Sequence, residues 1–269
     1  MSSKKILFIA QEITPYLPES PIATTCRHLP QAIQEKGKEI RTFMPRFGNI
    51  NERRNQLHEV IRLSGMNIII NDVDHPLIIK VASIQAARMQ IYFIDNEDFF
   101  KRKATVADED TNIEFEDNDE RSIFFVRGVL ETVKKLRWIP DIIHCHGWMT
   151  ALTPLYIKSL YADDPCFKDT KVIYSLYNDD FKQSFDANFV NKLSFDNIPK
   201  KMLESLDKDV SYENLTKFAI DTSDGIIQHE ENINPSILEH IKSSNKKFLP
   251  YQGDVPESVD AINNFYDNF

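Results

Sequence analysis

The chain has 269 residues, of which 42% are hydrophobic and 27% charged, so it can bury a sizeable core and is not a wholly disordered protein. Its formal net charge of −9 and isoelectric point near 5.3 disfavour nucleic acid or an anionic membrane surface as a partner, because both attract clustered positive charge. It has only seven glycines and no Gly-x-Gly or Walker-type loop, so a nucleotide site of the common kind is not expected.

Apolar patterns in the first 50 residues predict a β–loop–α–β unit. Residues 6–10 form a continuous apolar run, typical of a strand that is buried on both faces. A proline-containing loop precedes a predicted helix over 25–36, which ends at Gly37, and a second short strand covers 40–44. This order is typical of a doubly wound, mostly parallel α/β sheet.

Residues 58 to 95 show a different pattern, with strand-like runs and no clear helix between them. The runs cover 58–63, 66–70, 77–81 and 91–94. They predict a β-rich insertion at about 57–118, with antiparallel or mixed pairing. An acidic stretch over 101–121 is interpreted as a solvated loop, because its carboxylates lack the spacing of a metal site.

Alternating strands and helices resume after this insertion. The predicted helices cover 120–137, 146–159, 212–220, 235–241 and 257–268, and the predicted strands cover 141–145, 171–176 and 225–228. Residues 180–212 are mostly polar and are expected to form a long loop with a short helix at 199–206. The last helix is amphipathic, with Val259, Ile262 and Phe265 at helical spacing.

The cysteines and the apolar runs bear on the compartment. Cys26, Cys145 and Cys166 are an odd number without Cys-x-x-Cys spacing, which favours reduced thiols over a disulfide framework or a zinc site. The run at 6–10 is too short for a signal-peptide core, and no stretch approaches 18 apolar residues. We therefore expect a soluble, cytoplasmic protein.

Two histidines lie at the end of the predicted strand 141–145, in the segment Pro-Asp-Ile-Ile-His-Cys-His-Gly-Trp at 140–148. Open α/β sheets bind ligands at the carboxyl ends of their strands. In an extended segment the rings of His144 and His146 lie on the same side, which suits a metal or a sugar hydroxyl. The alternative is a pair that holds the βα turn by hydrogen bonds. Trp148 could offer a stacking face to a sugar, although core packing is the more frequent use of such a ring.

Several segments together carry a resemblance to a known family. They are residues 140–148 with 150–156, residues 5–12 with 15–16, residues 29–33 with Gly37 and 44–48, and residues 92–96, 117–121 and 124–125. In their order and their residues they resemble the glycogen and starch synthases, glycosyltransferase family 5. The resemblance is good over about residues 4–178 and thin over 179–245.

This resemblance implies a single Rossmann-like domain of the GT-B N-terminal type over 1–245, followed by a tail with a short helix over 246–269. In the family, the N-terminal domain faces the glucan acceptor and a C-terminal domain supplies most of the nucleotide-sugar site. That second domain is expected to be absent here. ADP-glucose would be the family donor.

Three family positions with reactive residues differ in this chain. The family loop Lys-Thr-Gly-Gly-Leu corresponds to residues 18–22, where Pro18 offers no N–H donor and Glu19 would repel a diphosphate. The Asp of the family motif His-x-His-Asp-Trp is replaced by Gly147, and the His of its His-Asn pair by Tyr177. We therefore expect no catalytic residues, no cofactor and no binding of ADP-glucose.

The hypothesis that follows is a non-catalytic relative that binds an α-glucan or a protein partner. Its residual cleft is predicted to be lined by Glu12, His144, His146, Trp148 and Asn178, with no metal. Asp179 and Asp180 are further carboxylates near this cleft. An alternative is an active glucosyltransferase half completed by a separate nucleotide-binding chain, which leaves the three replacements unexplained. A third possibility is a hydrolase or metal enzyme that reuses the two histidines with the acidic loop, but no carboxylate stands at ligand spacing.

Overall fold

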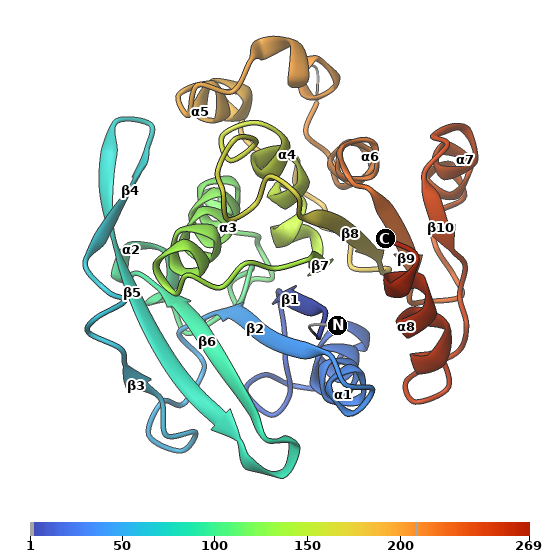
Figure 1. Ribbon diagram of the computed structural model, residues 1–269. Coiled ribbons are helices and arrows are strands. Elements are labelled where there is room, and N and C mark those ends of the chain that lie inside the picture. Colours follow the sequence, from blue (N-terminus) through green and yellow to red (C-terminus); the bar gives the residue numbers. More distant parts are fainter. Residues whose placement is uncertain (1–2, 208) are drawn as a thin grey trace.

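The computed structural model describes residues 3–207 and 209–269, which form one mixed sheet with helices on both faces (Figure 1). The strands are β1 (Lys5–Ala10), β2 (Glu39–Pro45), β3 (His58–Glu59), β4 (Met66–Ile70), β5 (Val73–Ile84), β6 (Met89–Asp95), β7 (Ile142–His146), β8 (Lys171–Leu176), β9 (Gly225–Gln228) and β10 (Lys247–Leu249). Their order is β10-β9-β8-β7-β1-β2-β6-β5-β3, and β4 pairs with β5. The strands from β10 to β6 are parallel, whereas β5 pairs antiparallel with β3, β4 and β6.

The helices are α1 (Pro21–Glu35), α2 (Glu97–Phe100), α3 (Asn118–Lys135), α4 (Thr153–Lys158), α5 (Phe189–Ser194), α6 (Tyr212–Thr222), α7 (Pro235–Ser243) and α8 (Val259–Asp267). Helices α1 and α8 pack against each other on one face of the sheet, and α3, α4 and α6 lie on the other (Figure 1). No helix in the two described ranges is long and apolar enough to cross a membrane.

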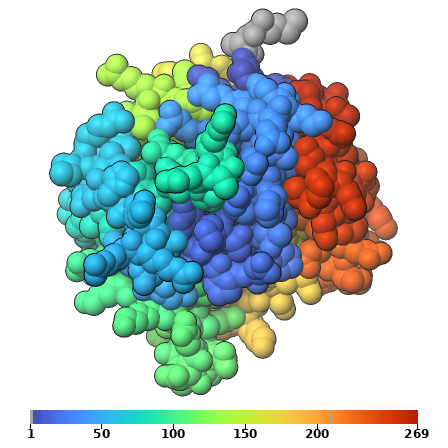
Figure 2. All heavy atoms as spheres, turned by 90° about the horizontal axis from the view of Figure 1, so that it is seen from below, coloured from blue at the N-terminus to red at the C-terminus, as the bar shows by residue number. Residues whose placement is uncertain are grey.

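The smaller of two apolar cores lies between the sheet and the helix pair α1–α8. Because successive strand residues point to opposite faces, Ile6 and Phe8 of β1 enter this core and Leu7 enters the larger one. Helix α8 contributes Tyr266, which is fully buried. Figure 2 shows this face of the molecule, with the C-terminal residues in red beside the N-terminal residues in blue. Helix α8 thus completes the layer that α1 begins.

The larger core lies under α3 and extends to the antiparallel strands. Gly128 lets α3 approach the sheet closely, because a Cβ at this position would lie 3.0 Å from side-chain atoms of Leu77 and Ile94. The side-chain hydroxyl of Thr132, one turn later, donates a hydrogen bond to the Gly128 carbonyl oxygen. This packing fixes α3, whose first turn borders the site described below.

The predicted doubly wound α/β class is confirmed, with differences in single elements. The strand expected at 58–63 ends at Glu59, where a turn begins. The helix expected at 146–159 is a 3₁₀ turn followed by the short α4, because Pro154 suits the first turn of a helix and not its interior. The polar stretch 180–212 contains α5, and two 3₁₀ turns replace the helix expected at 199–206. Strand β10 lies beyond the predicted domain limit at 245 and pairs with β9.

Candidate functional site

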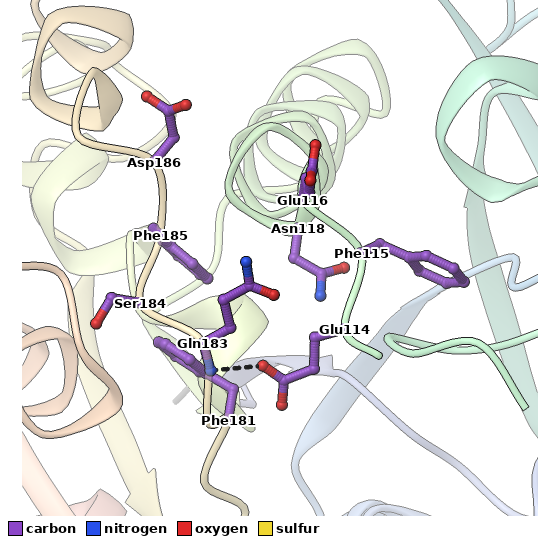
Figure 3. A pocket seen from close by; sticks show the side chains of 9 residues that line it. All are labelled: Glu114, Phe115, Glu116, Asn118, Phe181, Gln183, Ser184, Phe185 and Asp186. Carbon is purple, nitrogen blue, oxygen red and sulfur yellow. Dashed lines mark hydrogen bonds between the residues drawn. The ribbon is translucent and has the colours of Figure 1, made fainter. Parts of the chain in front are cut away.

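Three adjoining hollows follow the edge of the sheet at which its parallel strands end, the usual ligand position in open α/β sheets. The outer hollow, about 320 Å³, lies between residues 114–118 and 181–186 (Figure 3). The central hollow, about 280 Å³, shares Glu114 and Phe181 with it. The inner hollow, about 540 Å³, shares Glu230 with the central one and reaches Val255. We call the three together the acidic groove.

The lining of the acidic groove is strongly negative. Its carboxylates are Glu12, Glu19, Glu114, Glu116, Asp179, Asp180, Asp186, Glu230, Glu231 and Asp254. Within the described ranges, no lysine or arginine lines any of the three hollows. Carboxylates that line one groove add their fields, so the groove repels anions and attracts hydroxyl and N–H donors.

The outer hollow joins two segments that are far apart in the sequence. Figure 3 shows Phe181 and Phe185 on one side and Glu114 with Asn118 on the other. The Glu114 carboxylate accepts hydrogen bonds from the backbone N–H groups of Lys182 (2.9 Å) and Gln183 (2.8 Å). This ion-to-backbone contact closes the hollow and fixes the distance between its walls.

The start of α1 borders the inner and central hollows, both of which Ser20 and Pro21 line. The Ser20 hydroxyl accepts a hydrogen bond from the backbone N–H of Ala23 at 3.0 Å and donates one to the Glu12 carboxylate at 2.6 Å. Pro21 is the first residue of the helix and has no N–H. One N–H of the first turn is therefore already bonded to a side chain and Pro21 offers none, so fewer donors are left for a phosphate at this helix start.

The loop after β8 forms the floor of the central hollow. The Asp179 carboxylate accepts hydrogen bonds from the backbone N–H of Trp148 (3.0 Å) and the hydroxyl of Tyr212 (2.8 Å). Burial raises the pKa of Asp179 to about 6, although both hydrogen bonds act in the opposite direction. The backbone N–H of the preceding Asn178 donates to Glu230 at 2.9 Å, so the ends of β8 and β9 are tied together.

Two predicted cleft residues, His144 and His146, are fully buried beneath the groove and do not line it. His144 is hydrogen-bonded through Nδ1 to the Tyr266 hydroxyl and through Nε2 to the Ser175 hydroxyl, both at 2.6 Å. His146 is bonded through Nδ1 to the Tyr177 hydroxyl at 2.8 Å. The pair therefore bonds to neighbouring elements and not to its own βα turn. Burial lowers the pKa of both imidazoles well below the usual value, so they are neutral.

The other three predicted cleft residues, Glu12, Trp148 and Asn178, line the central hollow. Trp148 is only 2% exposed, and its ring packs edge-on against Phe181 at 5.1 Å. Its main contribution is therefore to hold the aromatic wall. Tyr177, at the family His position, is buried and directed away from the groove toward His146.

Gly147 has a backbone conformation that excludes other residues. Its φ is 88° with ψ at 154°, a region that is essentially restricted to glycine. A Cβ at this position would also lie 2.7 Å from Cβ of Gln11. The Gln11 side chain in turn accepts the backbone N–H of Met149 at 3.1 Å, which holds it in place. An aspartate at this position would therefore be strained and would clash with Gln11.

His229 belongs to the site and was missed in the sequence. It directly follows β9 and is 7% exposed, its ring stacked on Tyr177 and its side chain at the inner hollow. Its position at a strand end is the same signal that singled out His144. The wall residues Glu114 and Phe185 were missed as well, because their pairing across the outer hollow follows no local sequence period.

The model of the starch synthase catalytic domain matches residues 5–245 of the chain. The chain belongs to this family. Curated relatives of this starch synthase family member include glycogen synthases from Pelodictyon phaeoclathratiforme, 38% identical over 174 residues, and from Chlorobium limicola and Chlorobaculum tepidum, both 39% identical over 174 residues. Each match covers 65% of the chain and 36% of the relative, so the chain spans about a third of the length of these relatives.

A similar solved structure is the catalytic domain of starch synthase IV from Arabidopsis thaliana, bound to ADP and acarbose. The TM-score is 0.73 with 18% sequence identity, and the match covers 93% of the chain and 51% of the plant chain. This likeness confirms the GT-B type of α/β fold that the resemblance implied. The family member therefore carries the mostly parallel sheet and the flanking helices of that fold.

Proposed function

We propose that this starch synthase family member binds an α-glucan segment in the acidic groove and does not itself transfer glucose. The observation that supports this proposal is the composition of the groove. Carboxylates, amides and aromatic rings line it, and no lysine or arginine does so in the part of the chain that the structure describes. These groups bond neutral hydroxyls and stack on sugar faces, and they disfavour a diphosphate.

The chemistry at the start of α1 argues against a sugar-nucleotide donor. A donor diphosphate there would meet the carboxylates of Glu12 and Glu19 without any cation to offset them. The Ala23 N–H is already bonded to Ser20, and Pro21 has no N–H to offer. The plant starch synthase IV structure holds both ADP and acarbose. Only an oligosaccharide of that kind suits the charge of this groove.

The outer hollow offers the groups that a glucan needs. Phe185 is partly exposed, and its ring is stacked on that of the buried Phe181 at 4.7 Å, which gives a rigid apolar wall. Opposite this wall, Glu114 and Asn118 supply oxygen acceptors and an amide. A glucose ring has an apolar face and a rim of hydroxyls, so it matches a wall of this kind facing acceptors.

The three unpaired cysteines agree with a reducing compartment, and we place the protein in the cytoplasm.

Two measurements test the two halves of this proposal. Transfer of labelled glucose from ADP-glucose and from UDP-glucose onto glycogen is assayed at micromolar protein, beside a full-length synthase. We expect no transfer above a heat-killed blank, and transfer above the blank would refute the non-catalytic half. The alternative of a glucosyltransferase completed by a separate nucleotide-binding chain predicts transfer only after that chain is added. Electrophoresis through gels with and without glycogen measures binding, and an unchanged mobility would refute the glucan half.

A matched pair of variants locates the binding site. Phe185→Ala removes half of the apolar wall, and we expect it to weaken retardation by glycogen about tenfold, the effect of losing one stacked aromatic ring. Phe195→Ala removes an equally large ring that is 49% exposed and lines none of the three hollows, so its retardation should match that of the wild type. Equal losses in both variants would place the glucan outside the groove.

A further inference from the structure

Three histidine side chains lie together beneath the inner hollow. The ring centroids of His144 and His146 are 4.0 Å apart, and those of His146 and His229 are 5.4 Å apart. One ring nitrogen from each of the three lies within 4.8 Å of the others, and all three residues are buried. The first two come from alternate positions of β7 and the third from the end of β9, so two strands that do not pair supply one cluster.

Two nitrogens of this cluster lack a hydrogen-bond partner. Nε2 of His146 and Nε2 of His229 are both buried without a partner among the residues that the structure describes. An unpaired buried polar atom loses its bonds to water without compensation, and native proteins keep few of them. The proposed glucan binding gives neither of these nitrogens a partner.

Hydrogen bonds around the cluster orient its rings as they would be oriented in a metal site. The Tyr177 hydroxyl is bonded to Nδ1 of His146, and in the tautomer in which Nδ1–H donates to this hydroxyl, Nε2 of the ring presents its lone pair. His229 is only 7% exposed and its ring is stacked on that of Tyr177, which fixes the direction in which its unpartnered Nε2 points. Histidines that bind metals typically have their second nitrogen held by such an outer partner. Nδ1 of His144 is held in the same way by Tyr266.

We propose that His144, His146 and His229 bind one divalent transition-metal ion of the zinc type. Three neutral imidazoles are a common zinc ligand set, and they disfavour magnesium and calcium, which prefer oxygen. Zinc–nitrogen bonds of about 2.1 Å place tetrahedral ligand nitrogens about 3.4 Å apart. Binding therefore draws the rings together by at most about 1.4 Å from their present spacing. At His144 the metal bond replaces the hydrogen bond to Ser175.

A path for the ion leads through the inner hollow. His229 lines this hollow, which has a volume of about 540 Å³ and is bordered by Glu230, Glu231 and Asp254. These carboxylates raise the local concentration of cations at the opening. In the described part of the chain, the histidine cluster includes no carboxylate. No buried anion therefore offsets the positive charge of the bound ion.

The test uses untagged protein stripped with a chelator and then titrated with Co²⁺ as a spectroscopic substitute for zinc. With a solvent molecule as the fourth ligand, we expect the intense visible bands of four-coordinate cobalt to saturate at one ion per chain and to disappear when Zn²⁺ is added. Zn²⁺ should also raise the melting temperature by several degrees, and chelator should reverse the rise. A wild type that shows neither the bands nor retained zinc after gel filtration would overturn the proposal, and a buried water molecule would then be the partner of the two nitrogens.

Two variants assign the ion to the cluster. His229→Gln removes a ligand that lies at the edge of the cluster, and its Nε2 gives up no hydrogen bond, so the fold should be retained. We expect at least a hundredfold loss of Co²⁺ affinity. His240→Gln is the matched control, because His240 is partly exposed, is bonded to Asp221 and lines none of the three hollows. Unchanged affinity in His229→Gln, or an equal loss in His240→Gln, would refute the site. If His229→Gln does not fold, the wild-type spectrum and the zinc-dependent melting temperature decide.

Discussion

At Gly147 the backbone conformation and the packed Gln11 side chain both exclude any other residue. Restoring the family residue with Gly147→Asp should therefore cost stability without creating activity. We expect a loss of about 3 kcal/mol or more in the free energy of unfolding, from backbone strain and overpacking together. Urea denaturation followed by circular dichroism measures this loss.

Gly37→Asp is the matched control for this prediction. Gly37 also has a positive φ, 91°, but a Cβ there would meet no atom within 4 Å. Its substitution adds strain alone and should cost roughly half as much. Equal losses in the two variants would mean that Gln11 moves aside at no cost.

The carboxyl of Asp179 should make stability depend on pH. Its folded pKa of about 6 is above the ordinary value of 3.8, so the folded state binds more protons than the unfolded state between these values. Asp179 therefore contributes stability at low pH, and this contribution is lost as the pH rises through about 6. Asp179→Asn mimics the protonated acid at every pH. Its free energy of unfolding, relative to that of the wild type, should therefore be about 1 kcal/mol more favourable at pH 7.5 than at pH 5.

Urea unfolding of both proteins at the two pH values checks this prediction. Asp180→Asn removes the exposed neighbouring carboxylate and serves as the control. A gain of the same size in Asp180→Asn would show that the general negative charge of the groove is responsible, and not the buried position of Asp179.

Helix α5 is held to the molecule by buried charge pairs. The Lys192 ammonium lies 2.7 Å from the carboxylate of Asp119, which is 0% exposed, and 2.9 Å from that of Glu120. Lys192→Met leaves Asp119 buried without its cation and should cost about 3 kcal/mol. Lys200→Met, at an exposed lysine, should cost less than 0.5 kcal/mol, as is usual for surface substitutions. Hydrogen exchange of residues 181–207 should become faster only in the first variant.

How much could be predicted from the sequence depended on the kind of element. Strands such as β1 and β7 have uninterrupted apolar runs, because both of their faces are buried, and they were located within a residue or two. Helix α5 and strand β10 escaped prediction, because a short polar helix and a three-residue edge strand have no clear period. Their positions are decided by tertiary contacts such as the one between Lys192 and Asp119.

The candidate site, too, was predictable only where a sequence pattern marks the residues. Residues at strand ends were found by position, and Glu12, Trp148 and Asn178 do line the groove. His144 was placed in the cleft and is buried below it, because the sequence did not show that Tyr266 of α8 would cover its face of the sheet. The outer hollow joins the acidic insertion with the polar stretch after β8, and a contact of that separation leaves no trace in a single sequence.

At the scale of the whole molecule, the net charge is −9, and the groove lining has no lysine or arginine among the described residues. Neutral and charged ligands of this surface should therefore differ in how their binding depends on salt. Binding of a neutral glucan should change less than twofold between 50 and 500 mM NaCl, because no ion pair is made or screened. A basic protein partner on the same surface would lose affinity steeply over this range. Glycogen retardation measured at both salt concentrations distinguishes the two, and a steep loss would contradict the glucan proposal.

Strand β1 lies at the centre of the sheet, where Ile6 pairs with Ile40 on one side and with Ile142 on the other. A ribosome adds about 5–20 residues per second, so β1 waits roughly 7–27 s for its second neighbour. The face of β1 that carries Ile6 and Phe8 is covered first by α1, and its cover is complete only when Tyr266 of α8 has been made. While residues 11–141 are being made, the nascent chain thus carries an apolar strand with incomplete pairing, and its yield in cells should depend on the chaperones that meet it there.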